Sequence, residues 1–343
     1  MTLIQKSDHH DSLYERQEFE FVDYAPYVFH KMRHYDGILP RAYLKSLLQS
    51  DEILSSLKFS EGRSGSFFCK TADKKFVIKS IPAEEAQVFF QRLKRYFYHL
   101  AKFPDSFLVR IYSLMSLQLE HGTKIYVVVM RNAFDTDLSI SQRFDLKGSW
   151  VRRDSHVNFD KEPTKLGMDV DFARLQGKLI LSSEDADKFH NQIKIDSSFL
   201  RDCGIIDYSL LVGIHKKYVS SMNFSDNFGL IETSDSLIEL NEVKEQFEGD
   251  EKGKEDIVNC PPPFYKRWKG GIPSEDNSEV YFLQIIDIFQ LFNMKKKMEK
   301  CFKVYLLRKE EKGLSVQSPE VYAQRFIEKM KGIAEDSASP INF

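Results

Sequence analysis

The stretch Ile205-Ile206-Asp207-Tyr208-Ser209-Leu210-Leu211-Val212-Gly213-Ile214-His215 sets a single carboxylate among aliphatic and β-branched residues. The triplet Ile285-Ile286-Asp287 repeats its beginning eighty residues later. Apolar, β-branched runs of this kind predict buried strands. Each acid is expected at the point where its strand ends and the chain turns. The repeat therefore predicts a sheet that delivers two carboxylates to one edge.

A glycine-rich turn and a lysine precede these triplets. Gly62 and Gly65 of the turn 62–67 allow backbone N–H groups to approach phosphates closely, although an ordinary hairpin turn explains them too. Lys79 follows the apolar run Phe76-Val77-Ile78, where its ammonium needs an anion such as a nucleotide phosphate. A lysine on an edge strand, facing water, is the competing interpretation. The nucleotide-binding residues that we predict are Gly62, Ser64, Gly65, Ser66, Lys79 and Glu85.

The order of these parts is the order that phosphoryl transfer requires: a phosphate cradle, a cation, a base and a metal ligand. Asp207 is predicted to orient or accept the proton of the substrate hydroxyl, and Asp287 to bind Mg²⁺. Glu84 and Glu85 begin a predicted helix, where acids favour the helix dipole. Glu85 is also placed to orient Lys79. The chain reads as a kinase.

The composition predicts a folded intracellular protein. The 343 residues are 42% hydrophobic and 13% aromatic, enough for one large domain or two lobes. The four cysteines form no C-x-x-C pair, so a reduced chain without structural zinc is expected. We expect no secretion signal, no myristoyl anchor at Thr2 and no membrane-spanning segment. Membrane contact is therefore expected to be peripheral. No nucleic-acid partner is expected.

The charge is unevenly distributed behind a net value of −2. Residues 226–256 carry eleven Asp and Glu against three Lys, whereas residues 288–313 carry eight Lys and Arg against three Glu. The second segment interleaves its cations with aromatic and aliphatic residues, a pattern suited to an anionic lipid surface. An ordinary amphipathic core helix is the alternative.

The order of elements predicts two lobes. Strands are expected at 66–70, 75–81, 109–119, 124–130, 140–147 and 205–214, and helices within 24–49 (broken by Gly37 and Pro40), at 83–102 and at 185–202. Residues 1–17 are expected to form a mobile leader, residues 219–258 a solvated acidic insertion, and the tail after Gly332 a frayed end.

The segment Arg143-Phe144-Asp145-Leu146-Lys147-Gly148-Ser149 is expected to bind the substrate. It gathers several cations near a glycine, with Arg152 and Arg153 close behind. Such a group suits a phosphate-bearing head group, although a solvated basic turn has the same composition.

Taken together these residues resemble the phosphatidylinositol phosphate kinases over roughly residues 18–332. The longest matching strings are Asp145–Ser149 and Asp207–His215, joined by 62–68, 76–81, 285–290 and 314–326. The resemblance implies an α/β (α+β) fold with two lobes, an antiparallel sheet with helices in each, and an ATP cleft between them. The N-lobe would cover 18–135 and the C-lobe 136–332, with 333–343 as a tail.

The resemblance also implies roles for single residues. Lys79 would bind the ATP phosphates, Asp207 would act in catalysis and Asp287 would hold Mg²⁺. Lys147 and Arg153 would hold the lipid phosphate. Residues 288–318 would form an activation loop that touches the membrane and selects the substrate.

A single residue of that loop favours one subtype. Type I enzymes of the family carry a Glu two residues after a Lys pair, and here Glu299 follows Lys296-Lys297. Lys296, Lys297 and Glu299 are all expected to bind the substrate. This favours a 5-kinase acting on phosphatidylinositol 4-phosphate. The family resemblance further implies a homodimer and a location at the cytoplasmic face of the plasma membrane. The nucleus is a second expected location.

Three alternatives remain at this point. A type II enzyme would phosphorylate the 4-position of phosphatidylinositol 5-phosphate. A catalytically inactive scaffold would bind lipid without consuming ATP, but it has no need for Lys79, Asp207 and Asp287 together. A protein kinase would carry His-Arg before its catalytic Asp, where this chain has Ile205-Ile206.

Overall fold

A computed structural model describes residues 19–49, 58–59, 67–119, 122–162, 164–217, 270–292 and 317–336. All of these residues belong to one compact unit, Met1–Lys217 with Pro263–Phe343. The predicted leader and acidic insertion lie outside the described residues.

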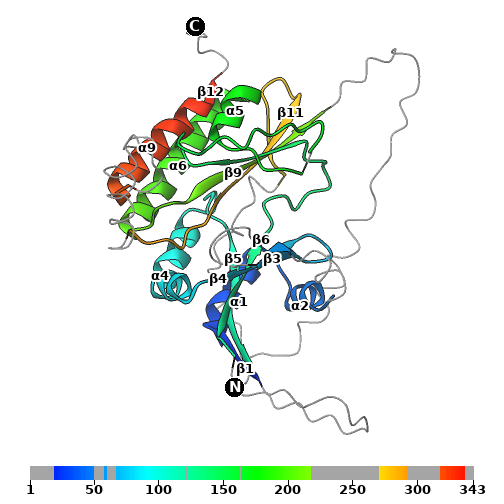
Figure 1. Cartoon of the computed structure of the whole chain (residues 1–343), viewed down its shortest axis with the longest axis vertical. Coiled ribbons are helices and arrows are strands. Elements are labelled where there is room, and N and C mark those ends of the chain that lie inside the picture. The colour runs from blue at the N-terminus through cyan, green and yellow to red at the C-terminus, as the bar shows by residue number, and fades with distance from the viewer. Residues whose placement is uncertain are drawn as a thin grey trace, which may run out of the picture. The chain divides into compact units, whose positions relative to one another are not determined.

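The first sheet has six strands, antiparallel throughout, in the order β1-β5-β6-β4-β3-β2 (Figure 1). Four of the strands were predicted from their apolar runs, and the prediction is confirmed to within two residues at each end. The edge strand β1 was missed, although its aromatic residues alternate with acids. The strands are β1 Phe19–Tyr24, β2 Lys58–Phe59, β3 Phe67–Lys70, β4 Phe76–Ile81, β5 Ile111–Leu119 and β6 Ile125–Arg131.

Three helices accompany this sheet: α1 Pro26–Tyr35, α2 Pro40–Leu48 and α4 Ala83–Lys102. The first two begin with a proline, which is tolerated in the first turn of a helix because a backbone N–H at that position would have no partner within the helix. The bounds of α4 match the predicted range. Acids in its first turn and His99 and Lys102 in its last turn complement the helix dipole.

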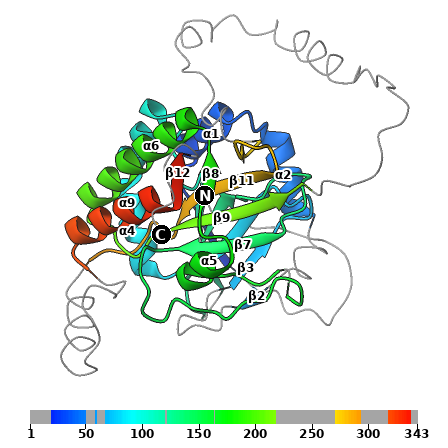
Figure 2. The same cartoon turned by 90° about the horizontal axis from the view of Figure 1, so that it is seen from above.

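The second sheet has four antiparallel strands in the order β10-β11-β9-β7. They are β7 Gln142–Leu146, β9 Ser209–Lys216, β10 Ile272–Pro273 and β11 Glu279–Ile286. Its helices are α5 Asp169–Leu175, α6 Ser183–Asp202 and α9 Pro319–Ile333. The helices α6 and α9 lie side by side (Figure 2), and α5 packs against β7.

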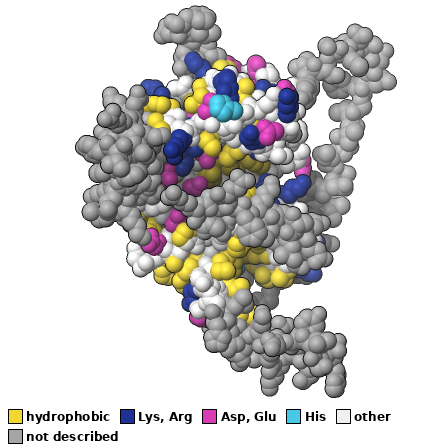
Figure 3. All heavy atoms as spheres, in the orientation of Figure 1, with side chains coloured by type: hydrophobic (Ala, Val, Ile, Leu, Met, Phe, Trp, Pro, Cys, Tyr) yellow, Lys and Arg dark blue, Asp and Glu magenta, His cyan; other side chains and the backbone are white. Residues whose placement is uncertain are grey.

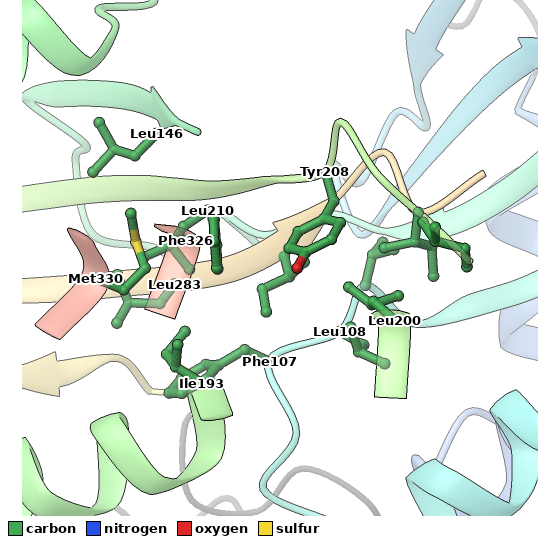
Figure 4. Packing of buried hydrophobic residues seen from close by; sticks show 14 of the residues in the cluster. Phe107, Leu108, Leu146, Ile193, Leu200, Tyr208, Leu210, Leu283, Phe326 and Met330 are labelled. Carbon is green, nitrogen blue, oxygen red and sulfur yellow. The ribbon is translucent and has the colours of Figure 1, made fainter. Parts of the chain in front are cut away.

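The two sheets are joined by main-chain hydrogen bonds. The segment before β5 pairs with β11 through Leu108 and Ile285, and the amide of Val109 donates to the Ile285 carbonyl at 2.8 Å. One cluster of buried apolar residues spans both sheets and helices α1, α4, α5, α6 and α9, while Tyr43 of α2 belongs to a smaller second cluster. Figure 4 shows Leu210 of β9 and Leu283 of β11 above Ile193 of α6. The described chain is therefore a mixed α+β fold with two antiparallel sheets.

A buried carboxylate adds polar contacts between α4, α6 and the segment before β5. Asp196 of α6 is fully buried and accepts hydrogen bonds from the Ser106 hydroxyl at 2.8 Å, the Phe107 amide at 2.8 Å and the Gln192 amide at 3.0 Å. The Nε2 atom of His99, on α4, lies 2.7 Å from its Oδ1. Because so many donors converge on one buried acid, we interpret Asp196 as structural.

Two predictions about boundaries were wrong. The strand predicted at 205–214 begins only at Ser209, because Ile205 and Ile206 pair instead with residues just after β11. The tail expected to fray after Gly332 continues as strand β12 (Ala334–Asp336), which pairs in parallel with β8 (Leu179–Leu181). Ala334 is fully buried, so the fold extends past the predicted end. Among the helices of the described chain, none has the length and apolar character needed to cross a membrane.

Candidate active site

Lys79 and Asp287 form an ion pair although 208 positions separate them. Lys79 lies on β4, paired with strands on both sides, and its Nζ atom is 2.6 Å from Oδ1 of Asp287 just after β11. Burial alone would lower the pKa of Lys79, but the carboxylate of Asp287, together with the charges of Glu85 and Asp145, outweighs burial and raises that pKa above its ordinary value. Burial likewise opposes the charge of Asp287, and the Lys79 ammonium lowers the pKa of that acid. Both groups are therefore held charged.

Lys147 and Asp207 form a second ion pair beside the first. The Nζ atom of Lys147 lies 2.9 Å from Oδ1 of Asp207, and the two side chains are 15% and 27% exposed. Lys147 follows β7 directly, and Asp207 precedes β9, the strand paired with β7. The charge of Lys147 also helps to lower the pKa of Asp287. Two lysines and two acids from distant parts of the chain thus share one site.

The antiparallel register of β9 and β11 places the two acids at the same edge of the sheet. Ser209, near the start of β9, pairs with Ile286 at the end of β11. Asp287 therefore follows its strand, as predicted, whereas Asp207 precedes one. The predicted edge is confirmed even though the predicted strand before Asp207 is absent.

The backbone at both acids is left-handed, with φ of 65° at Asp207 and 59° at Asp287. Few residues other than glycine adopt this conformation, and Asp is among those that do. The neighbour of Asp207 is held in place: Tyr208 is fully buried, and its ring packs edge-on against that of Phe326 with 5.0 Å between the ring centroids (Figure 4). The Tyr322 hydroxyl donates to the carbonyl of Tyr208. This anchoring fixes the backbone at Asp207 while its carboxylate stays outside the core.

Glu85 lies near the first ion pair. Its charge contributes to the raised pKa of Lys79, while the hydrogen bond of Lys79 goes to Asp287. The same helix contacts the segment after Asp287, where the rings of Phe89 and Phe289 meet edge-on at 5.5 Å. Helix α4 is therefore coupled by packing and by charge to Lys79 and Asp287.

Arg153, predicted to hold a lipid phosphate, is 8% exposed and already engaged. Its guanidinium donates to Oδ2 of Asp169 at 2.7 Å and to Oδ1 of Asp145 at 2.9 Å. Sequence reasoning missed Asp169 as a site residue, although it lies in an acid-rich string at the start of α5. The sequence signal that could have indicated Asp169 is the pair of acids Asp169 and Asp171 in the first turn of α5. Nothing in the sequence places Asp169 beside Lys147.

Several predicted residues lie outside the described part of the chain. They are Gly62, Ser64, Gly65 and Ser66 of the glycine-rich turn and Lys296, Lys297 and Glu299 of the activation loop. Their roles stay predictions. On the face displayed in Figure 3, Lys and Arg side chains are interspersed with Asp and Glu side chains rather than separated from them.

The donors at the site suit a hard divalent cation shared with a substrate. Asp287 and Asp207 offer carboxylate oxygens, and Asp287 is held ionised. Within the residues that the structure describes, no group of three or more His, Cys, Asp or Glu side chains forms a complete metal cage. Magnesium is usually bound by one or two carboxylates together with substrate phosphates and water, so these residues fit Mg²⁺ bound with a nucleotide.

A family model and several known proteins match most of this chain. The family model described as "Phosphatidylinositol-4-phosphate 5-Kinase" matches residues 48–333. A "Phosphatidylinositol 4-phosphate 5-kinase" of Plasmodium falciparum (isolate 3D7) is 32% identical over 90% of this chain, which spans 18% of that relative. The "Phosphatidylinositol 5-phosphate 4-kinase type-2 beta" of Homo sapiens is 31% identical over 92% of this chain and 77% of its own length.

A third relative, the "Phosphatidylinositol 4-phosphate 5-kinase type-1 beta" of Gallus gallus, is 30% identical over 91% of this chain and 58% of its own length. The relatives thus include 5-kinases and 4-kinases at nearly equal identity. Both the family model and the human relative cover most of the chain, including Lys79, Lys147, Asp207 and Asp287. The chain therefore belongs to the phosphatidylinositol phosphate kinase family.

Proposed function

We propose that this protein is a lipid kinase that transfers the γ-phosphate of ATP to the 5-hydroxyl of phosphatidylinositol 4-phosphate, giving phosphatidylinositol 4,5-bisphosphate. The observation that carries the proposal is the meeting of Lys79–Asp287 and Lys147–Asp207 in one site. A protein that only bound lipid would have no use for two ion pairs whose members are the residues that phosphoryl transfer requires.

The pair Lys79–Asp287 would receive the nucleotide. Lys79 would exchange the Asp287 carboxylate for phosphate oxygens of ATP, with Glu85 close enough to keep the ammonium charged. Asp287, freed from Lys79, would bind Mg²⁺, which neutralises charge on the transferred phosphoryl group. Gly62, Ser64, Gly65 and Ser66 would supply backbone and hydroxyl donors to the phosphates.

The pair Lys147–Asp207 would act on the acceptor. Asp207 would orient the inositol 5-hydroxyl and accept its proton as the new bond to the γ-phosphorus forms and the bond from that phosphorus to the β–γ bridging oxygen breaks, releasing ADP. A positioned base of this kind contributes about 10²–10⁴ in rate. Lys147 would hold the carboxylate of Asp207 in place and then meet the phosphate of the lipid. The sequence also assigns Arg153 to that phosphate, although its side chain is buried.

The choice of the 5-hydroxyl rests on Glu299, which follows Lys296 and Lys297 in the predicted activation loop. The alternative is a 4-kinase acting on phosphatidylinositol 5-phosphate, which relatives at 31% identity keep open. The basic segment 288–313 supports peripheral binding to an anionic membrane at the cytoplasmic face of the plasma membrane. A homodimer and a nuclear pool are further proposals from the family resemblance.

The test is a kinase assay with radiolabelled ATP, Mg²⁺ and liposomes that each carry one monophosphorylated phosphoinositide. We expect label in phosphatidylinositol 4,5-bisphosphate from the 4-phosphate and little from the 5-phosphate. Preferential use of the 5-phosphate would support the 4-kinase. Liposome binding without transfer from any lipid would support a scaffold and refute the proposal.

A further inference from the structure

We infer that Asp169 and Arg153 are positioning residues that hold Lys147 against Asp207, and that neither contacts the lipid. The two residues are called here the clasp. This inference rests on the proposed function and assigns Arg153 a different task from the phosphate contact predicted from the sequence. Its substance is a chain of hydrogen bonds that surrounds the turn after β7.

Asp169 binds the backbone of that turn. Its carboxylate accepts hydrogen bonds from the amide of Lys147 at 3.1 Å and the amide of Gly148 at 2.7 Å. The side chain of Asp169 is 15% exposed, so water competes weakly for these bonds. Hydrogen bonds to a charged acceptor are among the stronger ones in proteins. Asp169 thereby fixes the backbone from which Lys147 reaches Asp207.

Arg153 locks Asp169 in turn. Its Nε donates to Oδ2 of Asp169 at 2.7 Å, and the same guanidinium donates to both the carboxylate and the carbonyl of Asp145 on β7. The adjacent carboxylates outweigh the effect of burial and raise the pKa of Arg153 above its ordinary value. The guanidinium therefore ties the start of α5 to the end of β7, the two elements that flank the turn.

The far side of the turn is closed by α9. Gly148 is left-handed, with φ of 66°, and a Cβ atom placed there would lie 3.1 Å from Cβ of Lys329. The turn is thus confined between the clasp and α9. Of these two restraints, the clasp is the one to test, because substitutions at Arg153 or Asp169 weaken it without adding bulk to the turn.

The expected consequence concerns orientation more than affinity. Lys147 is 15% exposed and points its ammonium at Asp207, whereas the Arg153 side chain is 10% exposed and its donors face two acids. A displacement of about 1 Å in a positioned group costs up to about 10²-fold in rate. Loss of the clasp should therefore lower kcat, while the apparent affinity for lipid changes little because Lys147 keeps its charge for the lipid phosphate.

The kinetic experiment uses the full chain, with Arg153→Gln, Asp169→Asn and the double variant, and Lys165→Gln as a matched control. Lys165 lies in the same region of the C-lobe, in an exposed ion pair with Glu162. We expect each clasp variant to lose about 10–100-fold in kcat with less than about threefold change in lipid KM, and the double variant to be no worse than either single one. Arg153→Lys, which keeps one donor and the charge, should recover part of the loss, and Lys165→Gln should match the wild type.

The opposite pattern would overturn the inference. If Arg153 contacted the lipid phosphate, Arg153→Gln would raise lipid KM tenfold or more, while Asp169→Asn would leave KM and kcat close to wild type. Thermal unfolding of each variant identifies any that fail to fold, and for these Arg153→Lys and Asp169→Glu take their place.

A second measurement does not depend on activity. Acetylation of lysines by an N-hydroxysuccinimide ester, followed by mass spectrometry, reports the accessibility of Lys147 directly. We expect Lys147 to react several-fold faster in both clasp variants, with Lys165 as the internal standard. Unchanged labelling of Lys147 refutes the clasp even if the kinase is active. Faster labelling in a protein that phosphorylates no lipid would keep the clasp and refute the proposed function instead.

Discussion

Asp207 and Asp287 share a left-handed backbone, with φ of 65° and 59°, and lie just before and just after two paired strands, at the same edge of the sheet. Residues other than glycine pay about 1–3 kcal/mol for a sparsely populated conformation of this kind, so it persists only where the surroundings enforce it. Here buried neighbours, among them Tyr208 and Ile288, enforce it at both positions. The geometry turns each carboxylate away from the core toward its lysine.

This conformation allows a clean separation of folding from catalysis at Asp207. Glycine adopts positive φ without strain, so Asp207→Gly should keep the unfolding free energy within about 1 kcal/mol of wild type. Asp207→Asn should behave similarly, because Asn tolerates the same region. Both should lower kcat at least 10²-fold, since they remove the carboxylate that we propose as the base. Urea unfolding and the lipid kinase assay measure the two effects.

The matched control is Asn277→Gly. Asn277 has φ of 57° in the turn before β11, away from the two ion pairs. It should change neither stability nor turnover appreciably. Retained turnover in Asp207→Gly would remove Asp207 from the mechanism, and loss of folding there would mean that its side chain stabilises the site.

The ion pair of Lys79 and Asp287 should leave a mark on the pH dependence of stability. The pKa of Asp287 is lowered, so its contribution is present above its unfolded pKa and is lost as the pH falls through the folded value. The pKa of Lys79 is raised, so its contribution is present below its unfolded pKa and is lost as the pH rises through the folded value. The stabilising window thus runs from about pH 4 to about pH 10.

The measurement compares the wild type with Lys79→Met/Asp287→Asn by urea unfolding at a series of pH values. The difference in unfolding free energy should be constant across the neutral range and shrink at both ends. A difference that grows above pH 10 or below pH 4 would contradict the pairing. The exposed pair Lys165–Glu162 provides the control, because its removal should have little effect at any pH.

Features that depend on local sequence patterns could be predicted, whereas features that depend on pairing between distant residues could not. Helix α4 and strands β3–β6 follow from local patterns, because amphipathic spacing and β-branched runs report burial directly. Lys79, Asp207 and Asp287 stood out because each is a charged residue in or beside an apolar run, and Lys147 because it is one of several cations near a glycine. Charges in such places need partners, and the structure supplies them from one another.

The missed features depend on distant pairing. Ile205 and Ile206 have a strand composition, yet they pair with residues after β11 rather than extending β9, and no local pattern reports that. The strand β12 is three residues long and exists because β8 lies beside it. The sequence shows the charge of Arg153 but not the two acids that surround it, so its ion pairs with Asp145 and Asp169 could not be predicted.

The buried carboxylate of Asp196 gives a prediction about folding alone. Asp196→Ala removes the acceptor for Ser106, the Phe107 amide and Gln192, and the partner of His99, all at a buried position. Several buried donors left without an acceptor should together cost about 3–5 kcal/mol. Urea unfolding measures the loss. Asp202→Ala, at the exposed end of the same helix, should stay within about 0.5 kcal/mol of wild type, and equal losses in both variants would deny Asp196 its structural role.

Glu299 tests the choice between the two lipid substrates. It lies outside the described residues, and its predicted role rests on its place two positions after Lys296-Lys297. If it favours the 4-phosphate lipid, Glu299→Ala should shift the ratio of kcat/KM for phosphatidylinositol 4-phosphate over the 5-phosphate at least tenfold toward the latter, about 1.4 kcal/mol. Lys300→Ala, next to it, should lower binding to anionic liposomes slightly and leave that ratio unchanged, because a neighbouring cation contributes general attraction to the membrane. The two lipids are assayed in liposomes of equal charge, so that a change in ratio reports recognition of the head group. An unchanged ratio in Glu299→Ala would remove the residue on which the choice of a 5-kinase over a 4-kinase mostly rests.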